Sequence, residues 1–477
     1  MLGNMQSETE IYKKNNEENL KDTPSMKASI NDGMSNAVMM GCGESYFGVF
    51  SIFLRATTLE VGLISTLPQL IGAIVQWAGA INLDRIRSRR RVARIGSFIQ
   101  SLTFLPVAAL PFFSGAGHRS VALLLLFVII YYSASGATIP AWNSLIGDLI
   151  HPAIRGRFFG RRNTLTGLNS FIALTLAGVT LHVFEKQGFP EMGYFIIFSV
   201  AFLARLYSSH WLSRYDDPPL TVTSDQVFTF RQFIRRSPHS NFAKFVFFVA
   251  MINLGVSFSG PYFSLYMLRD LKYDYMAYTI VIATSTITQF LTFRHWGRIS
   301  DRFGNKKILN LCGWGMSLVP VLWLFSANIY YLVIIQVYSG IIWSGFNLAI
   351  ANFLFDAVTP PKRARCVAYQ GLMNGIAIFT GSVLGGITAG HLPDSVSIGP
   401  VVWQPVSMLL MVFLISGIIR FIAAYLLLKK FKEVREVEPI GHGELIFRIS
   451  HIKPIAGATF SLTTGLFHQQ KKDADDQ

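Results

Sequence analysis

The stretch Gly297-Arg298-Ile299-Ser300-Asp301-Arg302-Phe303-Gly304-Asn305-Lys306-Lys307 is a charged loop between two apolar segments, each long enough to cross a lipid bilayer. A weaker copy of this loop lies 217 residues earlier. The positions that correspond to Gly297, Asp301, Arg302, Lys306 and Lys307 are Ala80, Asp84, Arg85, Arg89 and Arg90. Two similar loops at this spacing predict a chain built from two related halves.

The composition indicates an integral membrane protein. Of the 477 residues, 51% are hydrophobic and 14% are charged, whereas a soluble protein carries about 25% charged residues. The net charge of +15 comes from short basic clusters between apolar segments, so we expect no nucleic-acid partner. The cysteines and histidines lack metal-ligand spacing and no phosphate-binding glycine loop occurs. We therefore expect no metal, no cofactor and no ATP-driven activity.

Twelve segments between residues 29 and 428 are long and apolar enough to be transmembrane helices. This pattern predicts an all-α integral membrane protein with 12 transmembrane helices in two pseudo-symmetric six-helix bundles. We expect an N-terminal tail over 1–28, a first bundle over 29–213, a central linker over 214–240, a second bundle over 241–430 and a C-terminal tail over 431–477.

The basic residues set the predicted orientation. Loops after even-numbered spans hold 17 Lys and Arg residues, and loops after odd-numbered spans hold 5. Basic loops face the cytoplasm, so both tails and the central linker are predicted to be cytoplasmic. We expect a monomeric, multi-pass protein of the plasma or inner cell membrane, in contact with membrane lipid.

The repeat extends beyond the charged loops. Asp148, Pro152, Arg155 and Arg157 recur as Asp356, Pro360, Arg363 and Arg365, and Arg205 recurs as Arg420. Tyr46-Phe47 in the first span recurs as Tyr262-Phe263 in the seventh. Parallel six-helix repeats are a known plan of membrane transporters, with the solute site near the midplane between the repeats.

Two motifs are similar to those of a known family. The spacing from Gly297 through Asp301-Arg302 to Lys306-Lys307 resembles the signature loop of the major facilitator superfamily of secondary transporters. Asp148-x6-Arg155-Gly156 resembles the acidic-x6-Arg-Gly pattern that this family places after the fourth span. The resemblance implies the two-bundle fold of this family and the transport of a small solute by alternating access.

The same resemblance implies a cytoplasmic gate. Its candidate residues are Asp84, Arg85, Arg89, Asp148, Arg155, Gly297, Asp301, Arg302, Lys306, Asp356 and Arg363. Asp84 and Asp301 are expected to approach helix N-termini of the opposite half, where a carboxylate is stabilised, and Gly297 to permit close helix packing. Alternatively, the basic clusters only determine topology.

The gate departs from the family pattern in both halves. The family usually places a basic residue four positions after the motif aspartate, and here those positions are Ser88 and Asn305. An ion pair to Asp148 is therefore expected from Arg85 or Arg89. An ion pair to Asp356 is expected from Arg302 or Lys306. Alternatively, the ion pairs to Asp148 and Asp356 are both absent.

Glu44 is the most informative charge within a predicted span. It lies near the middle of the first span, and its repeat counterpart is Gly260. A carboxylate there is costly unless it is paired, hydrated or protonated. Our main interpretation is coupling to H+. A contact with a cationic or amine substrate, and a structural ion pair with a buried arginine such as Arg205, remain alternatives.

Other polar residues in the spans are candidates for the cavity lining: Tyr46, Gln69, Trp142, Asn143, Asn253, Tyr262, Gln289, Trp343, Asn347 and Asn374. Tyr46 and Tyr262 form a pseudo-symmetric pair. An intramembrane arginine in the fourth span and a Gly-Pro pair in the fifth, both typical of drug antiporters of the family, are missing, as is the sugar-porter pattern after the sixth span. These absences count against a common drug exporter or a sugar porter.

The sequence therefore predicts a secondary active transporter, by symport or antiport, of a solute that it does not identify. An enzyme is not expected, because no nucleophile–base pair or metal site occurs. The alternative is a non-transporting membrane receptor or assembly scaffold with the same fold. A cavity filled by side chains would favour that alternative.

Overall fold

The computed structural model describes residues 23–82, 88–113, 115, 117–150, 152–219, 230, 235, 240–358, 360–392, 396–398, 401–403 and 407–435. Long helices make up almost all of this part of the chain. In the first half they are α2 (Pro24–Cys42), α3 (Phe47–Phe53), α4 (Thr58–Ile81), α5 (Arg89–Phe113), α6 (His118–Leu149), α7 (Pro152–Lys186) and α8 (Pro190–Leu212). In the second half they are α10 (Asn241–Leu265), α11 (Tyr275–Phe303), α12 (Asn305–Leu322), α13 (Ile329–Ala357), α14 (Pro360–His391) and α15 (Leu409–Leu427).

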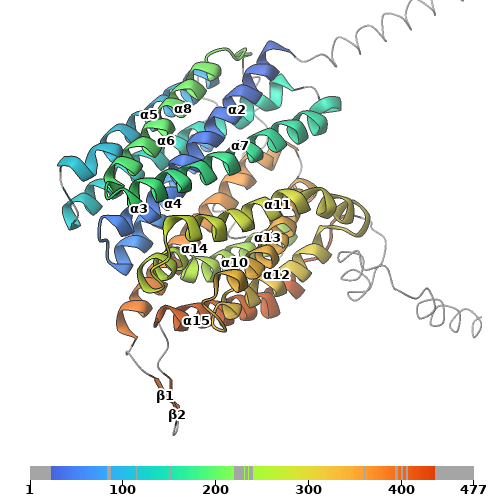
Figure 1. The fold of residues 1–477 in the computed structure, drawn as a ribbon. Coiled ribbons are helices and arrows are strands. Elements are labelled where there is room, and N and C mark those ends of the chain that lie inside the picture. Colours follow the sequence, from blue (N-terminus) through green and yellow to red (C-terminus); the bar gives the residue numbers. More distant parts are fainter. Residues whose placement is uncertain are drawn as a thin grey trace, which may run out of the picture.

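The helices form two bundles that lie side by side. Helices α2 to α8, blue to green in Figure 1, make the first half, and α10 to α15, yellow-green to red, make the second. The halves meet where α4 packs against α14 and where α7 packs against α11. Within the described residues, ten helices are long and apolar enough to span a membrane. The chain is thus a multi-pass membrane protein, in agreement with the sequence.

The two remaining predicted spans correspond to less apolar helices. The ninth span is α12, with 18 residues. The first span is interrupted, because α2 ends at Cys42 and a 3₁₀ turn over Glu44–Tyr46 precedes α3. Counting α2 and α3 as one interrupted span, the described helices agree with the twelve predicted segments.

Neighbouring helices approach closely at the break in the first span. Gly43 separates α2 from the 3₁₀ turn, and a Cβ atom added there would lie 2.5 Å from the Phe104 ring. The ring of Phe104 stacks on Phe47, 5.6 Å away, directly after the break. A larger residue at position 43 would push these elements apart. The break leaves Glu44 in the middle of the span, at a point where the helix does not continue.

The charged loop between the eighth and ninth predicted spans is a single tight turn. Helix α11 ends at Phe303, α12 begins at Asn305, and Gly304 between them has a φ of 86°. This backbone conformation strongly favours glycine. Helices α11 and α12 therefore join through one residue at this end of the bundle.

We name the two ends of the bundle by this turn. The end that carries Gly304, the start of α5 and the end of α15 is the basic face, and the other end is the outer face. At the outer face, between α14 and α15, the strands β1 (Val396–Ile398) and β2 (Val401–Trp403) form an antiparallel hairpin, which projects from the bundle in Figure 1. This hairpin was not predicted from the sequence. Its short valine-rich strands favour extended structure.

Candidate solute cavity and hinge contacts

Two cavities lie inside the bundle and share part of their lining. The first has a volume of about 400 Å³ and is lined by both halves, including Asn253 and Trp343 of the second half. The second, of about 490 Å³, lies within the first half, and its lining includes Asp32 and Arg162. Glu44, Gln69 and Tyr132 line both cavities. These three residues therefore stand where a path through the protein would pass.

Glu44 is held by two neighbouring tyrosines of α6. The Tyr131 hydroxyl donates to one carboxylate oxygen at 2.6 Å, and the Tyr132 hydroxyl donates to the other at 3.0 Å. The side chain is partly exposed, and the surface that it reaches is the cavity lining. Hydrogen bonds to an ionised acceptor are short and strong. The hydrogen-bond partners of Glu44 within the protein are thus a tyrosine pair and not Arg205.

Arg205 of α8 instead lies in a buried polar cluster with Asp32 of α2. Its guanidinium donates to Asn36 at 2.7 Å, to Gln100 at 3.0 Å and to Ser208 at 2.8 Å. Ser208 then donates to Asp32 at 2.6 Å. One hydroxyl therefore connects the buried cation to the buried carboxylate, which joins α2, α5 and α8.

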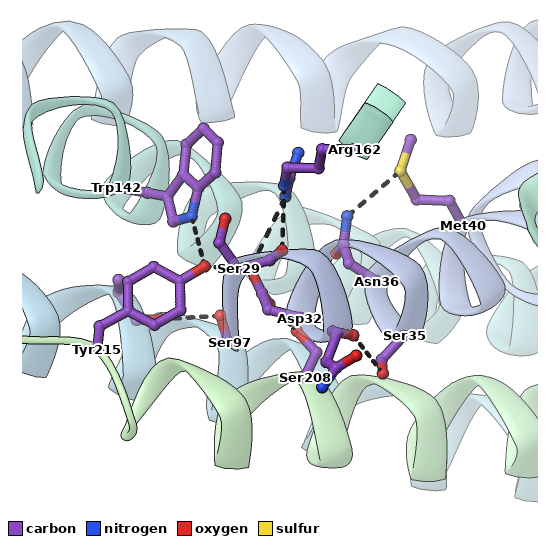
Figure 2. Close-up of polar contacts among 12 residues, drawn as sticks. Ser29, Asp32, Ser35, Asn36, Met40, Ser97, Trp142, Arg162, Ser208 and Tyr215 are labelled. Atoms are coloured by element: carbon purple, nitrogen blue, oxygen red, sulfur yellow. Dashed lines mark hydrogen bonds and ion pairs between the residues drawn. The ribbon is translucent and has the colours of Figure 1, made fainter. Parts of the chain in front are cut away.

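Asp32 has further partners on the side of the basic face. The Tyr215 hydroxyl donates to it at 3.2 Å, and a guanidinium nitrogen of Arg162 lies 3.9 Å away. Burial, together with the nearby Asp32 carboxylate, raises the pKa of Tyr215, so its hydroxyl stays a neutral donor. Arg162 also lies over the Trp142 ring, 4.7 Å from its centre. Figure 2 shows these neighbouring side chains, from Trp142 and Arg162 through Asp32 to Ser208.

The second half presents a different wall to the first cavity. Its described lining residues are polar but uncharged or apolar, and include Ser257, Ser264 and Tyr278. Arg420, the counterpart of Arg205, is buried behind this wall. It donates to the carbonyl of Met316 at 3.0 Å and to the hydroxyl of Ser259 at 2.9 Å. No ion pair to a carboxylate is described for it.

Four of the predicted cavity residues line the cavities: Gln69, Trp142, Asn253 and Trp343. Tyr46 and Tyr262 do not line either one, contrary to the prediction. Both are fully buried, and their hydroxyls donate to the backbone carbonyls of Leu174 and Ser382 at 2.8 and 2.6 Å. The pseudo-symmetric pair therefore joins helices, as a polar group in an apolar interior requires.

The remaining candidates lie outside both linings. Asn143 and Asn347 are exposed, and Gln289 and Asn374 are half-buried. Other lining residues were not predicted from the sequence, namely Asn36, Gln100, Tyr131, Tyr132 and Arg162. The adjacent tyrosines in the most apolar part of the fourth span were the available signal, because buried hydroxyls need a partner.

Polar contacts between the halves lie toward the outer face. The hydroxyls of Tyr194 and Tyr275 are 2.9 Å apart, and His182 lies 3.3 Å from Asp274. The Ser382 hydroxyl donates to the carbonyl of Gly62 at 3.2 Å. Each contact joins a residue of the first half to one of the second. They hold the halves together on the side away from Gly304.

At the basic face, the first half contains one of the predicted gate ion pairs. A guanidinium nitrogen of Arg89 lies 2.6 Å from a carboxylate oxygen of Asp148, and the Arg89 side chain is 1% exposed. Arg89 also donates to the Ser144 hydroxyl at 2.8 Å. Of the two cations considered from the sequence, Arg89 is thus the partner of Asp148 in the described part of the loop.

In the second half the partner of Asp356 differs from both predicted cations. Asn305 donates to Asp356 at 2.8 Å, and Arg435, beyond α15, lies 3.0 Å from the same carboxylate oxygen. Lys306, one of the predicted cations, points instead at the Phe431 ring, 3.5 Å from its centre. The repeat in the sequence places Arg89 opposite Lys306. In the structure, Asn305 contacts Asp356 as Arg89 contacts Asp148, so the equivalent contact in the second half comes from the residue before Lys306.

Several gate predictions lie outside the described residues. Asp84 and Arg85 belong to this group, as do the side chains of Asp301, Arg155 and Arg363. Arg302 is exposed at the end of α11. Gly297 is not a close-packing position, contrary to expectation, because a Cβ atom there would meet nothing within 4 Å.

Comparisons with known proteins agree with this architecture. A family model described as Major Facilitator Superfamily matches residues 245–468. A segment of 120 residues, 24% of this chain, is 30% identical to the class H tetracycline resistance protein of Pasteurella multocida and covers 30% of it. A segment of 176 residues, 37% of this chain, is 26% identical to the multidrug resistance protein MdtG of Escherichia coli and covers 40% of it.

The similarity of the fold extends much further than that of the sequence. The crystal structure of a mutant of the nucleoside transporter NupG superposes with a TM-score of 0.61 at 16% identity, over 86% of this chain and 100% of that one. The chain spans less than half the length of the curated relatives named above. The fold is that of a membrane transporter of two helical bundles. The family model, the curated relatives and the superposed structure together support a transporter of the major facilitator superfamily type.

Proposed function

We propose that this protein is a secondary active transporter that moves a small solute across the membrane by alternating access. The bundles 29–213 and 241–430 are the moving units, and the segment 214–240 links them. The basic face is cytoplasmic, which follows from its arginine-rich loops, so the tails 1–28 and 431–477 lie on that side. The membrane is the plasma or inner cell membrane, and the working unit is a monomer.

One observation carries the proposal: a carboxylate stands where two cavities meet, inside a bundle that must lie in lipid. Glu44 is reached from the cavity between the halves and from the cavity within the first half. Because these cavities are not filled by side chains, the arrangement favours a transporter over a receptor or scaffold that merely keeps the fold. Intramembrane carboxylates facing such cavities mark ion and solute pathways.

Glu44 is the proposed proton-coupling residue. As a carboxylate it accepts hydrogen bonds from both Tyr131 and Tyr132. As a carboxylic acid it gains a donor and loses acceptor strength, so one tyrosine hydroxyl becomes free for a solute or water. The loading of a proton therefore changes the hydrogen-bonding character of the site that both cavities share.

The lining residues Gln69, Asn253 and Trp343 complete the proposed solute site. Amides orient a solute by hydrogen bonds, and an indole ring supplies an apolar face. The names of the similar proteins suggest two solutes to test first, tetracycline and a nucleoside. Both solutes serve as probes, because the drug-antiporter signatures are missing and the sequence identities to these proteins are low.

The experiment is solute uptake by purified protein in liposomes with a pH gradient. Tetracycline and uridine are supplied as labelled probes, and proton flux is followed with a dye trapped inside the vesicles. We expect uptake that depends on the gradient, and Glu44→Gln should abolish this dependence because the amide cannot release a proton. Glu60→Gln is the matched control, since Glu60 pairs with His118 at the outer face.

Two results would contradict the proposal at different levels. Gradient-driven uptake that survives in Glu44→Gln removes Glu44 as the coupling residue. Uptake of neither probe, together with no proton movement in a wider screen of metabolites, counts against transport itself.

A further inference from the structure

Each half ends in a short segment that packs against the start of the helix that follows its charged loop, Ser88–Arg90 in the first half and Asn305–Lys306 in the second, and we call these residues the hinge of each half. The first exit segment is Tyr215–Pro218, directly after α8, and the second is Phe431–Arg435, after α15. Tyr215 and Phe431 occupy equivalent repeat positions, as do Asp217 and Glu433, and both aromatic residues are buried. From the sequence alone, these segments were interpreted as the start of a linker and of a tail.

The exit segment of the first half is anchored to the start of α5. Asp217 accepts a hydrogen bond from the Ser88 hydroxyl at 2.5 Å and from the backbone N–H of Arg90 at 3.4 Å. The Arg90 side chain donates to the carbonyl of Tyr215 at 2.8 Å. A carboxylate thus satisfies N–H groups that the first turn of a helix leaves free.

The exit segment of the second half repeats this arrangement on α12. Glu433 accepts a hydrogen bond from the backbone N–H of Lys306 at 2.8 Å. The Lys306 ammonium group lies 3.5 Å from the centre of the Phe431 ring, and Asn241 and Lys432 bond each other twice, at 2.9 and 2.8 Å. Both exit segments therefore provide a carboxylate to the helix that follows the charged loop.

The two halves differ in the source of the cation. In the first half, Arg89 of the hinge neutralises Asp148 and donates to the carbonyl of Pro218 at 2.9 Å. In the second half the equivalent hinge residue is Asn305, which has no charge. Arg435 supplies the charge from the opposite direction, 3.0 Å from Asp356, and also donates to the carbonyl of Ser300 at 3.2 Å.

We infer that Arg435 is a positioning residue for alternating access: it replaces the hinge cation that the second half lacks and holds α11, α13 and the second exit segment as one unit. Ser300 is in α11 and Asp356 is in α13, so a single side chain connects both helices to the end of α15. This inference rests on the proposed function. The docked exit segment sets the orientation of α11, which packs against α7 of the other half.

The contact is suited to a role in switching because it is only partly buried. The side chains of Arg435 and Asp356 are 34% and 22% exposed, so water can solvate both charges when they separate. A fully buried pair would be too costly to break in each cycle. Arg89, at 1% exposure, is the permanent counterpart in the first half.

The test measures the distance between the halves at the basic face in the full-length protein. Spin labels replace the exposed residues Arg94 of α5 and Arg298 of α11, and the native cysteines stay because all three are buried. We expect Arg435→Gln to change the ratio of the short-distance to the long-distance population by threefold or more. Arg435→Lys should restore most of it, and Lys430→Gln, which removes a nearby exposed charge, should leave it unchanged.

A charge exchange keeps the test decisive. The double variant Asp356→Arg with Arg435→Asp should recover the wild-type distribution if the pair itself acts. A monodisperse Arg435→Gln protein with the wild-type distribution overturns the inference. If Arg435→Gln does not fold, the exchange variant decides: recovery supports the inference and failure overturns it. The distances do not require transport, so absent solute uptake with shifted distances would count only against the proposed function.

Discussion

Arg205 and Arg420 lie in corresponding helices of the two halves, and both are buried, yet their surroundings differ. Arg205 reaches the Asp32 carboxylate through one serine hydroxyl. Arg420 is neutralised by no described carboxylate and donates to a backbone carbonyl and a serine hydroxyl. The duplicated scaffold thus keeps its buried arginines, while the charged residues described in the cavity linings belong to the first half.

The strongest test of this difference replaces each arginine by methionine, which keeps much of the length but not the charge. Arg205→Met should destabilise the protein by roughly 3–5 kcal/mol, because the buried Asp32 carboxylate then keeps only the Arg162 guanidinium, 3.9 Å away, as a described cation. Arg420→Met removes hydrogen bonds of about 1–3 kcal/mol in total but also removes a charge from an apolar interior. Thermal unfolding in detergent should therefore rank Arg205→Met well below Arg420→Met, and equal losses would contradict the asymmetry.

A second pair of substitutions tests where the halves remain alike. Gly136 of α6 and Gly340 of α13 pack against a neighbouring helix so closely that an added Cβ would lie 2.1 Å from the Gly72 carbonyl oxygen and 2.6 Å from that of Ser285. Alanine at either position should cost about 1–3 kcal/mol through overpacking. Similar drops in unfolding temperature are expected for the two variants. A tolerated alanine in one half alone would show that the scaffold itself has diverged.

The smallest effect is expected at Gly260, the counterpart of Glu44. A Cβ added there would meet nothing within 4 Å, and the residue lines the cavity between the halves. Gly260→Ala should leave solute uptake unchanged and change stability by no more than about 1 kcal/mol. Uptake assays on matched amounts of protein check this. A large loss of uptake would place the solute directly against this helix and make the second half more than a neutral wall.

Much of the architecture was predictable because it follows from the length and composition of segments. The spans, the repeat and the pairing of Asp148 with one of two cations, Arg85 or Arg89, come from patterns that are local or recur at a fixed distance. The hairpin over Val396–Trp403 was missed because two short strands between long helices have a weak signal. Tyr46 and Tyr262 were misplaced because a polar residue in a span satisfies its hydroxyl equally well against a helix carbonyl or a cavity.

The partner of Asp356 could not be read from the sequence for a different reason. Asn305 showed that a cation was missing from the hinge, but nothing near it in the chain indicated a replacement. Arg435 reaches the site only because Phe431 and Glu433 turn the chain back against α12. Such a contact depends on tertiary packing, so a motif search confined to the loop offers Arg302 and Lys306 and omits the residue that takes the role.

The order in which these charges leave the ribosome follows from the same contact. Arg89 is synthesised before Asp148, so the first half can neutralise its acid as soon as its fourth span is inserted. Asp356 must wait for Arg435, which emerges only after the final span. The second half therefore completes its contacts at the basic face last. A variant that is truncated or fused directly after Leu428 would lack Arg435 and leave the Asp356 carboxylate without this cation.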